Sequence, residues 1–172
     1  MRLPAALAAA TIAVTLTLNA QARSDLSRLV GRTLSGTVVS VADGDTVRIR
    51  FDSIAWTIQV RLEGIDCPEM SEAFGPAARN ATRVMMFDRI VQVKATDVDR
   101  YDRLVGRIII DGKDSSIELL GAGLACHYTR HSSDRSLAAA QLDAKSIGRG
   151  FWAAGALTPS CARSAASRMR AR

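Results

Sequence analysis

Two aspartates, Asp45 and Asp66, stand beside turn residues at the ends of predicted strands. Hard cations such as Ca²⁺ bind several oxygen ligands, which carboxylates, main-chain carbonyls and water supply. Two aspartates from different strand ends would provide part of such a site. Aspartate is also common in turns that bind nothing, so the tripeptide Asp43-Gly44-Asp45 taken alone favours an ordinary turn.

Two arginines and a glutamate have the chemistry that phosphoryl transfer requires. Arg61 lies on the polar face of its predicted strand, and Arg103 directly precedes an apolar strand. A guanidinium group binds phosphate oxygens in bidentate fashion and stabilises charge that develops there. Glu69 lies in a loop, where its carboxylate could act as general base on a water molecule. Each residue also fits an ordinary strand or surface role, but the set as a whole predicts phosphodiester chemistry.

Alternating apolar and polar residues predict five strands. Helical spacing of apolar residues predicts two helices, and the capping-box pattern of residues 115–118 predicts a third. The strands are expected over 34–41, 46–51, 56–62, 90–95 and 104–110, and the helices over 76–85, 116–122 and 134–146. Two hairpin-joined strands, a helix and two more strands are compatible with an OB-type barrel. The pattern alone fits other α+β folds as well.

The first 22 residues have the composition of an export signal. Arg2 precedes an apolar, alanine-rich run, and Ala20-Gln21-Ala22 forms a cleavage pattern, so we expect cleavage after Ala22. The run is shorter than a membrane-spanning helix needs, and an uncleaved anchor is the alternative. We therefore predict a periplasmic or secreted protein without stable membrane association after cleavage.

The rest of the chain divides into three parts. Residues 23–33 form a polar lead-in, residues 34–155 form one domain, and residues 156–172 form a small, basic tail that we predict to be disordered. The formal net charge of +6 suits a polyanionic partner such as nucleic acid. Many basic proteins bind no nucleic acid, so charge alone does not decide the function.

Three segments, residues 43–47, 60–69 and 99–106, resemble the signature blocks of the staphylococcal nuclease-like (thermonuclease) family. They occur in the family's order and at its approximate spacing, and the resemblance covers residues 34–152. It implies an α+β fold, an OB-type five-stranded β-barrel with three appended helices. It also implies a monomeric, calcium-dependent endonuclease that hydrolyses DNA or RNA with weak sequence preference. The alternative is a catalytically weak or inactive OB-type module that binds nucleic acid or protein.

The resemblance assigns one calcium ion to the site. Asp45 and Asp66 match the family's two calcium-ligand aspartates, and Cys67 stands where a main-chain carbonyl also binds the ion. Asp43 matches an acidic residue near the metal that supports its ligands.

The resemblance also assigns the catalytic groups. Glu69 matches the general base, while Arg61 and Arg103 match the arginines that bind phosphate and stabilise the transition state. Tyr101 and Tyr128 are expected to contact the substrate, with Tyr128 in an aromatic wall for a base.

Two features of the chain need separate predictions. Asp102 replaces the family's usual glycine, and its charge beside Arg103 is expected to pull that guanidinium away from phosphate. In the fold that the resemblance implies, Cys67 and Cys126 lie near each other, so we predict a Cys67–Cys126 disulfide. A Cys126–Cys161 bridge is the alternative.

Overall fold

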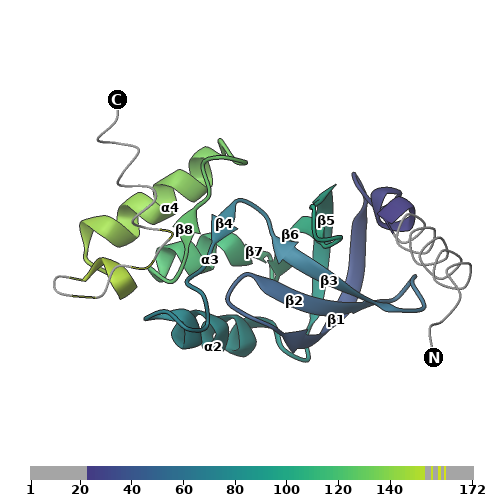
Figure 1. The fold of residues 1–172 in the computed structure, drawn as a ribbon, viewed down its shortest axis with the longest axis horizontal. Coiled ribbons are helices and arrows are strands. Elements are labelled where there is room, and N and C mark those ends of the chain that lie inside the picture. The colour runs from purple at the N-terminus through teal and green to yellow at the C-terminus, as the bar shows by residue number, and fades with distance from the viewer. Residues whose placement is uncertain (1–22, 154–155, 157–158, 160, 162–172) are drawn as a thin grey trace, which may run out of the picture.

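The computed structural model describes residues 23–153, 156, 159 and 161. Its main sheet has the strand order β3-β2-β1-β5-β6-β7, and β3 also pairs with β6. That additional pairing closes five of these strands into a barrel (Figure 1). The strands are β1 (Thr33–Val41), β2 (Thr46–Phe51), β3 (Thr57–Leu62), β5 (Ile90–Val98), β6 (Leu104–Ile110) and β7 (Lys113–Asp114). The predicted α+β fold with an OB-type five-stranded barrel is confirmed.

The barrel forms because each strand alternates between an apolar and a polar face. In β2, Val47, Ile49 and Phe51 are buried, whereas Arg48 and Arg50 are exposed. Successive side chains of a strand point to opposite faces, so the apolar set of every strand fills the interior. The polar set is left at the surface and at the strand ends.

The three predicted helices are present, and two further short strands join them to the barrel. The helices are α2 (Gly75–Met86), α3 (Ser115–Gly121) and α4 (Arg135–Ser146), followed by the 3₁₀ turn η1 (Gly150–Trp152). Strand β4 (Ile65–Asp66) pairs with β8 (Cys126–His127), a pairing that the sequence pattern did not predict. In Figure 1, α3, α4 and β8 lie on one side of the molecule and the loop that connects β2 to β3 lies on the other.

Arg107 of β6 links the barrel to the starts of two helices. Its guanidinium donates to Asp114, 2.5 Å away, and to Asp134, also 2.5 Å away. Asp114 caps α3 and Asp134 caps α4 by accepting main-chain N–H hydrogen bonds. One side chain therefore holds both helix termini against the sheet.

The predicted Cys67–Cys126 disulfide is wrong. Cys126 is bonded to Cys161, and Cys67 is a buried free thiol. The cross-strand partner of Cys126 is Asp66. Because neighbouring side chains on a strand point to opposite faces, Cys67 points away from Cys126 and joins the main core, while Cys126 packs with Phe151.

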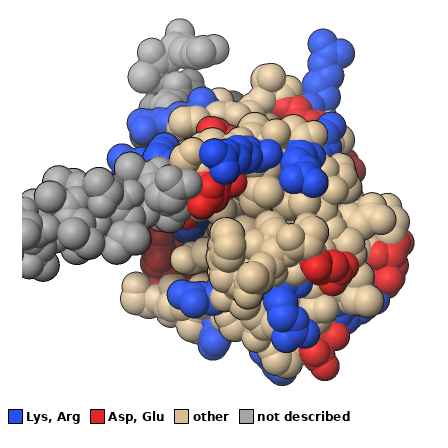
Figure 2. Space-filling model, turned by 90° about the vertical axis from the view of Figure 1, so that its right-hand side faces the viewer, with Lys and Arg blue, Asp and Glu red and all other residues tan. Residues whose placement is uncertain are grey.

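The predicted export signal lies outside the described residues, as does most of the predicted tail. Within the described part of the chain, no helix combines the length and apolar character needed to cross a membrane. Figure 2 views the molecule from the right-hand side of Figure 1 and shows basic and acidic side chains scattered over that face. This face therefore has no extended patch of one charge.

The disulfide pairing predicts which cysteine reacts with alkylating reagents. In the native protein, iodoacetamide should modify none of the three cysteines quickly, because Cys67 is buried and the other two are bonded. After unfolding without reductant, Cys67 alone should be labelled, as peptide mass spectrometry would detect. Replacing both Cys126 and Cys161 by serine should lower the free energy of unfolding by about 2–4 kcal/mol. A Cys67-containing disulfide peptide would contradict this pairing.

Candidate active site

One cavity of about 1220 Å³ opens where the barrel meets the helices. The β1–β2 turn, β3, β4 and the β5–β6 loop all contribute to its wall. Every residue that the sequence analysis assigned to metal, substrate or catalysis lines it: Asp43, Asp45, Arg61, Asp66, Cys67, Glu69, Tyr101, Arg103 and Tyr128. The fold thus brings these separated residues together, while their individual roles stay predictions.

Asp45 is the most deeply buried acid of the cavity, with 4% of its surface exposed. One carboxylate oxygen accepts hydrogen bonds from the Thr46 hydroxyl and the Arg61 guanidinium, and the other accepts from the Cys67 main-chain N–H. Burial raises the pKa of Asp45 to about 6, even though the positive charge of Arg61 opposes that rise. The carboxylate is held in a fixed orientation in a place where an added positive charge would be favourable.

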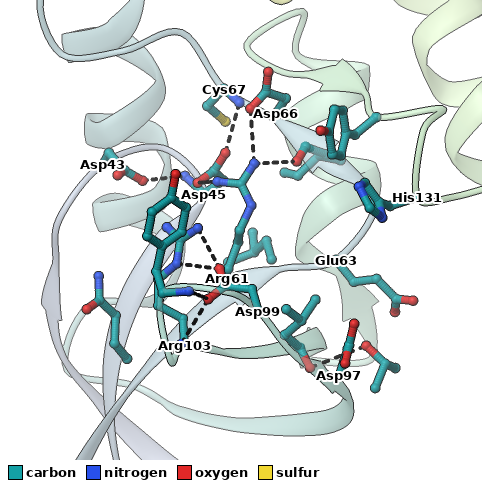
Figure 3. A pocket seen from close by; sticks show the side chains of 18 of the residues that line it. Asp43, Asp45, Arg61, Glu63, Asp66, Cys67, Asp97, Asp99, Arg103 and His131 are labelled. Carbon is teal, nitrogen blue, oxygen red and sulfur yellow. Dashed lines mark hydrogen bonds and ion pairs between the residues drawn. The ribbon is translucent and has the colours of Figure 1, made fainter. Parts of the chain in front are cut away.

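Arg61 joins the two aspartates that the sequence analysis assigned to calcium. Its guanidinium nitrogens lie 2.9 Å from an Asp45 oxygen and 3.0 Å from an Asp66 oxygen (Figure 3). A further hydrogen bond to the Ile65 carbonyl fixes its orientation. Arg61 was predicted to bind phosphate; in the structure it also orients both carboxylates, and 21% of its side chain remains exposed.

Arg103 is held by Asp99 rather than disturbed by Asp102. Its Nε lies 2.7 Å from an Asp99 oxygen, and Asp99 also accepts the main-chain N–H groups of Tyr101 and Arg103. Asp102 adopts a left-handed backbone with φ of 56° and pairs with Arg23 at 2.6 Å. The expected conflict between Asp102 and Arg103 is therefore absent, because the Asp102 carboxylate points to another part of the chain.

Aromatic rings flank the charged groups on two sides. Two guanidinium groups lie close to the Tyr101 ring, with Arg100 at 4.8 Å and Arg103 at 5.4 Å from the ring centroid. On another wall, the Tyr128 and His131 rings pack with centroids 5.1 Å apart and an interplanar angle of 32°. Such surfaces accept nucleobases by stacking.

Glu69 is exposed at the edge of the cavity, in the segment between β4 and α2. Its main-chain N–H donates to the Glu72 carboxylate, and its carbonyl accepts from the Glu72 N–H. These bonds fix the backbone and leave the side chain facing solvent. A base that must reach a water molecule can occupy such a position.

The cavity offers ligand atoms of the type that a hard cation binds. Asp43, Asp45 and Asp66 supply carboxylate oxygens, which calcium prefers over nitrogen or sulfur. Within the residues that the structure describes, no three acidic, histidine or cysteine side chains are close enough to bind a metal unaided. A calcium ion would thus need main-chain carbonyl and water ligands, as the predicted role of the Cys67 carbonyl requires.

Sequence reasoning missed several residues that shape the cavity. Asp99 had no predicted role, although its position four residues before Arg103 was a usable signal. The Thr46 hydroxyl donates to Asp45 and accepts from Arg103 at 3.4 Å. Glu63 and His131, which no motif singled out for a role, also line the wall.

Comparisons with known proteins give a consistent result. Residues 59–154, more than half of the chain, match the family described as staphylococcal nuclease homologue. The chain is 37% identical over 101 residues to a probable staphylococcal-like nuclease CAN1 of Oryza sativa subsp. japonica; the match covers 59% of this chain and 30% of that protein. It is 31% identical over 116 residues to an uncharacterized endonuclease of Haemophilus influenzae, covering 67% and 65%. It is 39% identical over 102 residues to a micrococcal nuclease of Shigella flexneri, covering 59% and 53%. The chain thus matches less than two thirds of the length of these relatives.

Gly44 gives a structural test of how tightly this site is packed. A Cβ atom at Gly44 would lie 2.8 Å from the Cys67 sulfur and 2.8 Å from the Ala78 Cβ. We expect Gly44→Ala to lower the free energy of unfolding by about 1–3 kcal/mol in urea titration, because neither neighbour can move freely.

Gly121→Ala is the matched control, since nothing lies within 4 Å of a Cβ atom there. It should change the free energy of unfolding by at most about 1 kcal/mol. Equal effects of the two substitutions would contradict the tight packing of the turn.

Proposed function

This chain belongs to the staphylococcal nuclease homologue family, and from that premise we propose that it is an exported, calcium-dependent endonuclease that hydrolyses phosphodiester bonds of DNA or RNA. Nuclease homologues support the hydrolase activity. The observation that carries the proposal is the convergence of Asp45, Asp66, Arg61, Arg103 and Glu69 on one cavity. Such a set of oxygen ligands, guanidinium groups and a base matches the needs of phosphodiester hydrolysis.

In the proposed reaction, Arg61 and Arg103 bind the non-bridging oxygens of the scissile phosphate. Both guanidinium groups are already oriented by carboxylates, Arg61 by Asp45 and Asp66 and Arg103 by Asp99. Donors that are fixed before the substrate binds need little reorganisation in the transition state. The carboxylate of Glu69 takes a proton from the attacking water, whose oxygen forms the new bond to phosphorus as the bond from phosphorus to one sugar oxygen breaks. The departing sugar oxygen takes up a proton from solvent.

Calcium, when bound by Asp45, Asp66 and the Cys67 carbonyl, supplies Lewis-acid polarisation of the phosphate. Asp43 accepts the Asp45 main-chain N–H at 3.0 Å and so supports the turn that carries this ligand. Contacts to phosphate oxygens carry no sequence information, which supports weak sequence preference.

The proposed location is the periplasm or the medium, on the basis of the composition of residues 1–22. After signal cleavage the protein is proposed to act as a monomer without stable membrane association. Its disulfide between Cys126 and Cys161 is consistent with an oxidising compartment.

Cleavage should require both calcium and the Glu69 carboxylate. Single-stranded and duplex DNA and RNA should be degraded in calcium and left intact when EGTA is present. Glu69→Gln should lower the turnover number by at least about 100-fold with a much smaller effect on substrate binding, because proton transfer is lost and the phosphate contacts remain. Gel assays and fluorescence binding would measure the two effects. Cleavage in EGTA would refute the calcium requirement, and a fully active Glu69→Gln protein would refute the base assignment.

Asp99 and Asp102 should respond differently to the same substitution. Asp99→Asn frees the Arg103 guanidinium, so the turnover number should fall by about tenfold or more. Asp102→Asn removes only an exposed ion pair with Arg23, and asparagine accepts the left-handed backbone, so the rate should stay within about twofold. Both variants carry the same change of net charge, which makes each a control for the other. A loss in Asp102→Asn as large as that in Asp99→Asn would contradict the assigned positioning role of Asp99.

A further inference from the structure

The outer face of the β2–β3 hairpin continues the candidate site along the barrel. Three cross-strand pairs follow one another on that face: Thr46 and Arg61, Arg48 and Gln59, and Arg50 and Thr57. Arg61 and Gln59 line the cavity, and the Cβ atoms of directly opposite residues lie about 4.5–5.5 Å apart. Arg48 therefore stands at the cavity rim, with Arg50 one pair farther out. In Figure 1, β2 and β3 run together from near β4 to their connecting loop on the right.

Arg48 and Arg50 present positive charge that the protein does not neutralise. Both side chains are exposed. Neither guanidinium has a hydrogen bond or ion pair within the part of the chain that the structure describes. Their cross-strand neighbours on β1, Ser40 and Thr37, are uncharged, as are those on β3. A phosphate on this face would therefore meet two cations without a competing carboxylate among their cross-strand neighbours.

An exposed aromatic side chain stands at the outer end of this row. Trp56 directly precedes Thr57, the cross-strand partner of Arg50, and 56% of its surface is exposed. It belongs to neither of the two apolar clusters of the described residues. Bases of an unpaired strand stack on such a ring, and a basic surface with an aromatic platform is typical of single-strand binding. The combination therefore favours a single strand over a duplex.

We propose that Arg48, Arg50 and Trp56, here called the hairpin track, bind the nucleotides that flank the scissile phosphate of a single-stranded substrate. This inference rests on the proposed nuclease function and assigns the path of its substrate. The scissile phosphate lies at Arg61 and Arg103. Phosphates farther along the same strand bind Arg48 and Arg50, and a base stacks on Trp56. These contacts read no base edge, which agrees with weak sequence preference.

The salt dependence of binding tests the two cations. The probe is a labelled oligothymidylate of about 15 nucleotides, near the upper site size of one such barrel. Its affinity for the full-length protein is measured by fluorescence anisotropy in EGTA over a range of salt concentrations. Each phosphate contact with a single strand adds about 0.7 to the steepness of log affinity against log salt concentration. The double substitution Arg48→Gln and Arg50→Gln should thus reduce the steepness by about 1.4 and weaken binding at low salt by about tenfold.

The double substitution Arg83→Gln and Arg135→Gln is the matched control. These arginines are exposed on α2 and α4, outside the cavity lining, and their loss changes the net charge by the same amount. The control should keep the wild-type salt dependence. Arg48→Lys with Arg50→Lys retains both charges and should also keep it, which separates the charge of the track from its packing.

Trp56→Ala tests the aromatic end of the track. It should weaken binding of the oligothymidylate by about fivefold or more, as expected for the loss of one stacked base, and leave the salt dependence unchanged. Binding of a duplex of the same length should change by less than about twofold, because its bases already stack on each other. Leu142→Ala removes an exposed apolar side chain from α4 and should bind both probes like the wild type.

The outcomes separate the hairpin track from the nuclease proposal. Cleavage in calcium together with an unchanged salt dependence in the Arg48, Arg50 variant overturns the track and leaves the nuclease proposal standing. A reduced salt dependence without any cleavage does the reverse. An equal reduction in the Arg83, Arg135 control shows an effect of net charge alone and overturns the track. An equal loss of duplex binding in Trp56→Ala overturns the assignment to a single strand.

Discussion

The ion pairs between Arg61 and two aspartates are the interactions on which the site depends. Asp45 comes from the β1–β2 turn and Asp66 from β4, and the Arg61 guanidinium contacts both. Burial and the negative charge of Asp43 raise the pKa of Asp45, and the positive charge of Arg61 opposes that rise. The bridging guanidinium links two carboxylates that are far apart in sequence and fixes their orientation. Removing Arg61 would thus disturb the two aspartates proposed as cation ligands as well as the proposed phosphate contact.

Barrel closure decides where these groups stand relative to Arg103. The pairing of β3 with β6 places Arg61 opposite Val105, two residues beyond Arg103. Without that pairing, the two guanidinium groups would belong to opposite edges of an open sheet. The Arg107 ion pairs extend the same arrangement to α3 and α4, and thereby place the β4–β8 ribbon and the Tyr128 wall beside the barrel end. The geometry of the candidate site is therefore a consequence of how the sheet closes.

The loop before β6 shows how a local replacement is accommodated. The left-handed backbone at Asp102, with φ of 56°, is a conformation that glycine adopts freely and aspartate tolerates. Its carboxylate then pairs with Arg23, and Asp99 is left as the partner of Arg103. The chain thus carries a charge at a position where the family resemblance leads one to expect glycine, without placing that charge on Arg103, the arginine proposed to bind phosphate.

The five strands followed from apolar periodicity, because the barrel interior accepts only one face of each strand. Two of the helices followed from helical spacing of apolar residues and the third from its capping pattern. The family motifs identified which acids and arginines belong to the cavity. Structural features that leave no periodic pattern in the sequence could not be predicted in this way. The β4–β8 pairing has only two residues per strand. The disulfide partner of Cys126 depends on which side of that ribbon each cysteine faces. The sequence by itself determined the elements and the kinds of chemical group. Only the tertiary structure decided which groups share a hydrogen bond, since a side chain's partner depends on register and direction across the fold, and neither is encoded in local spacing.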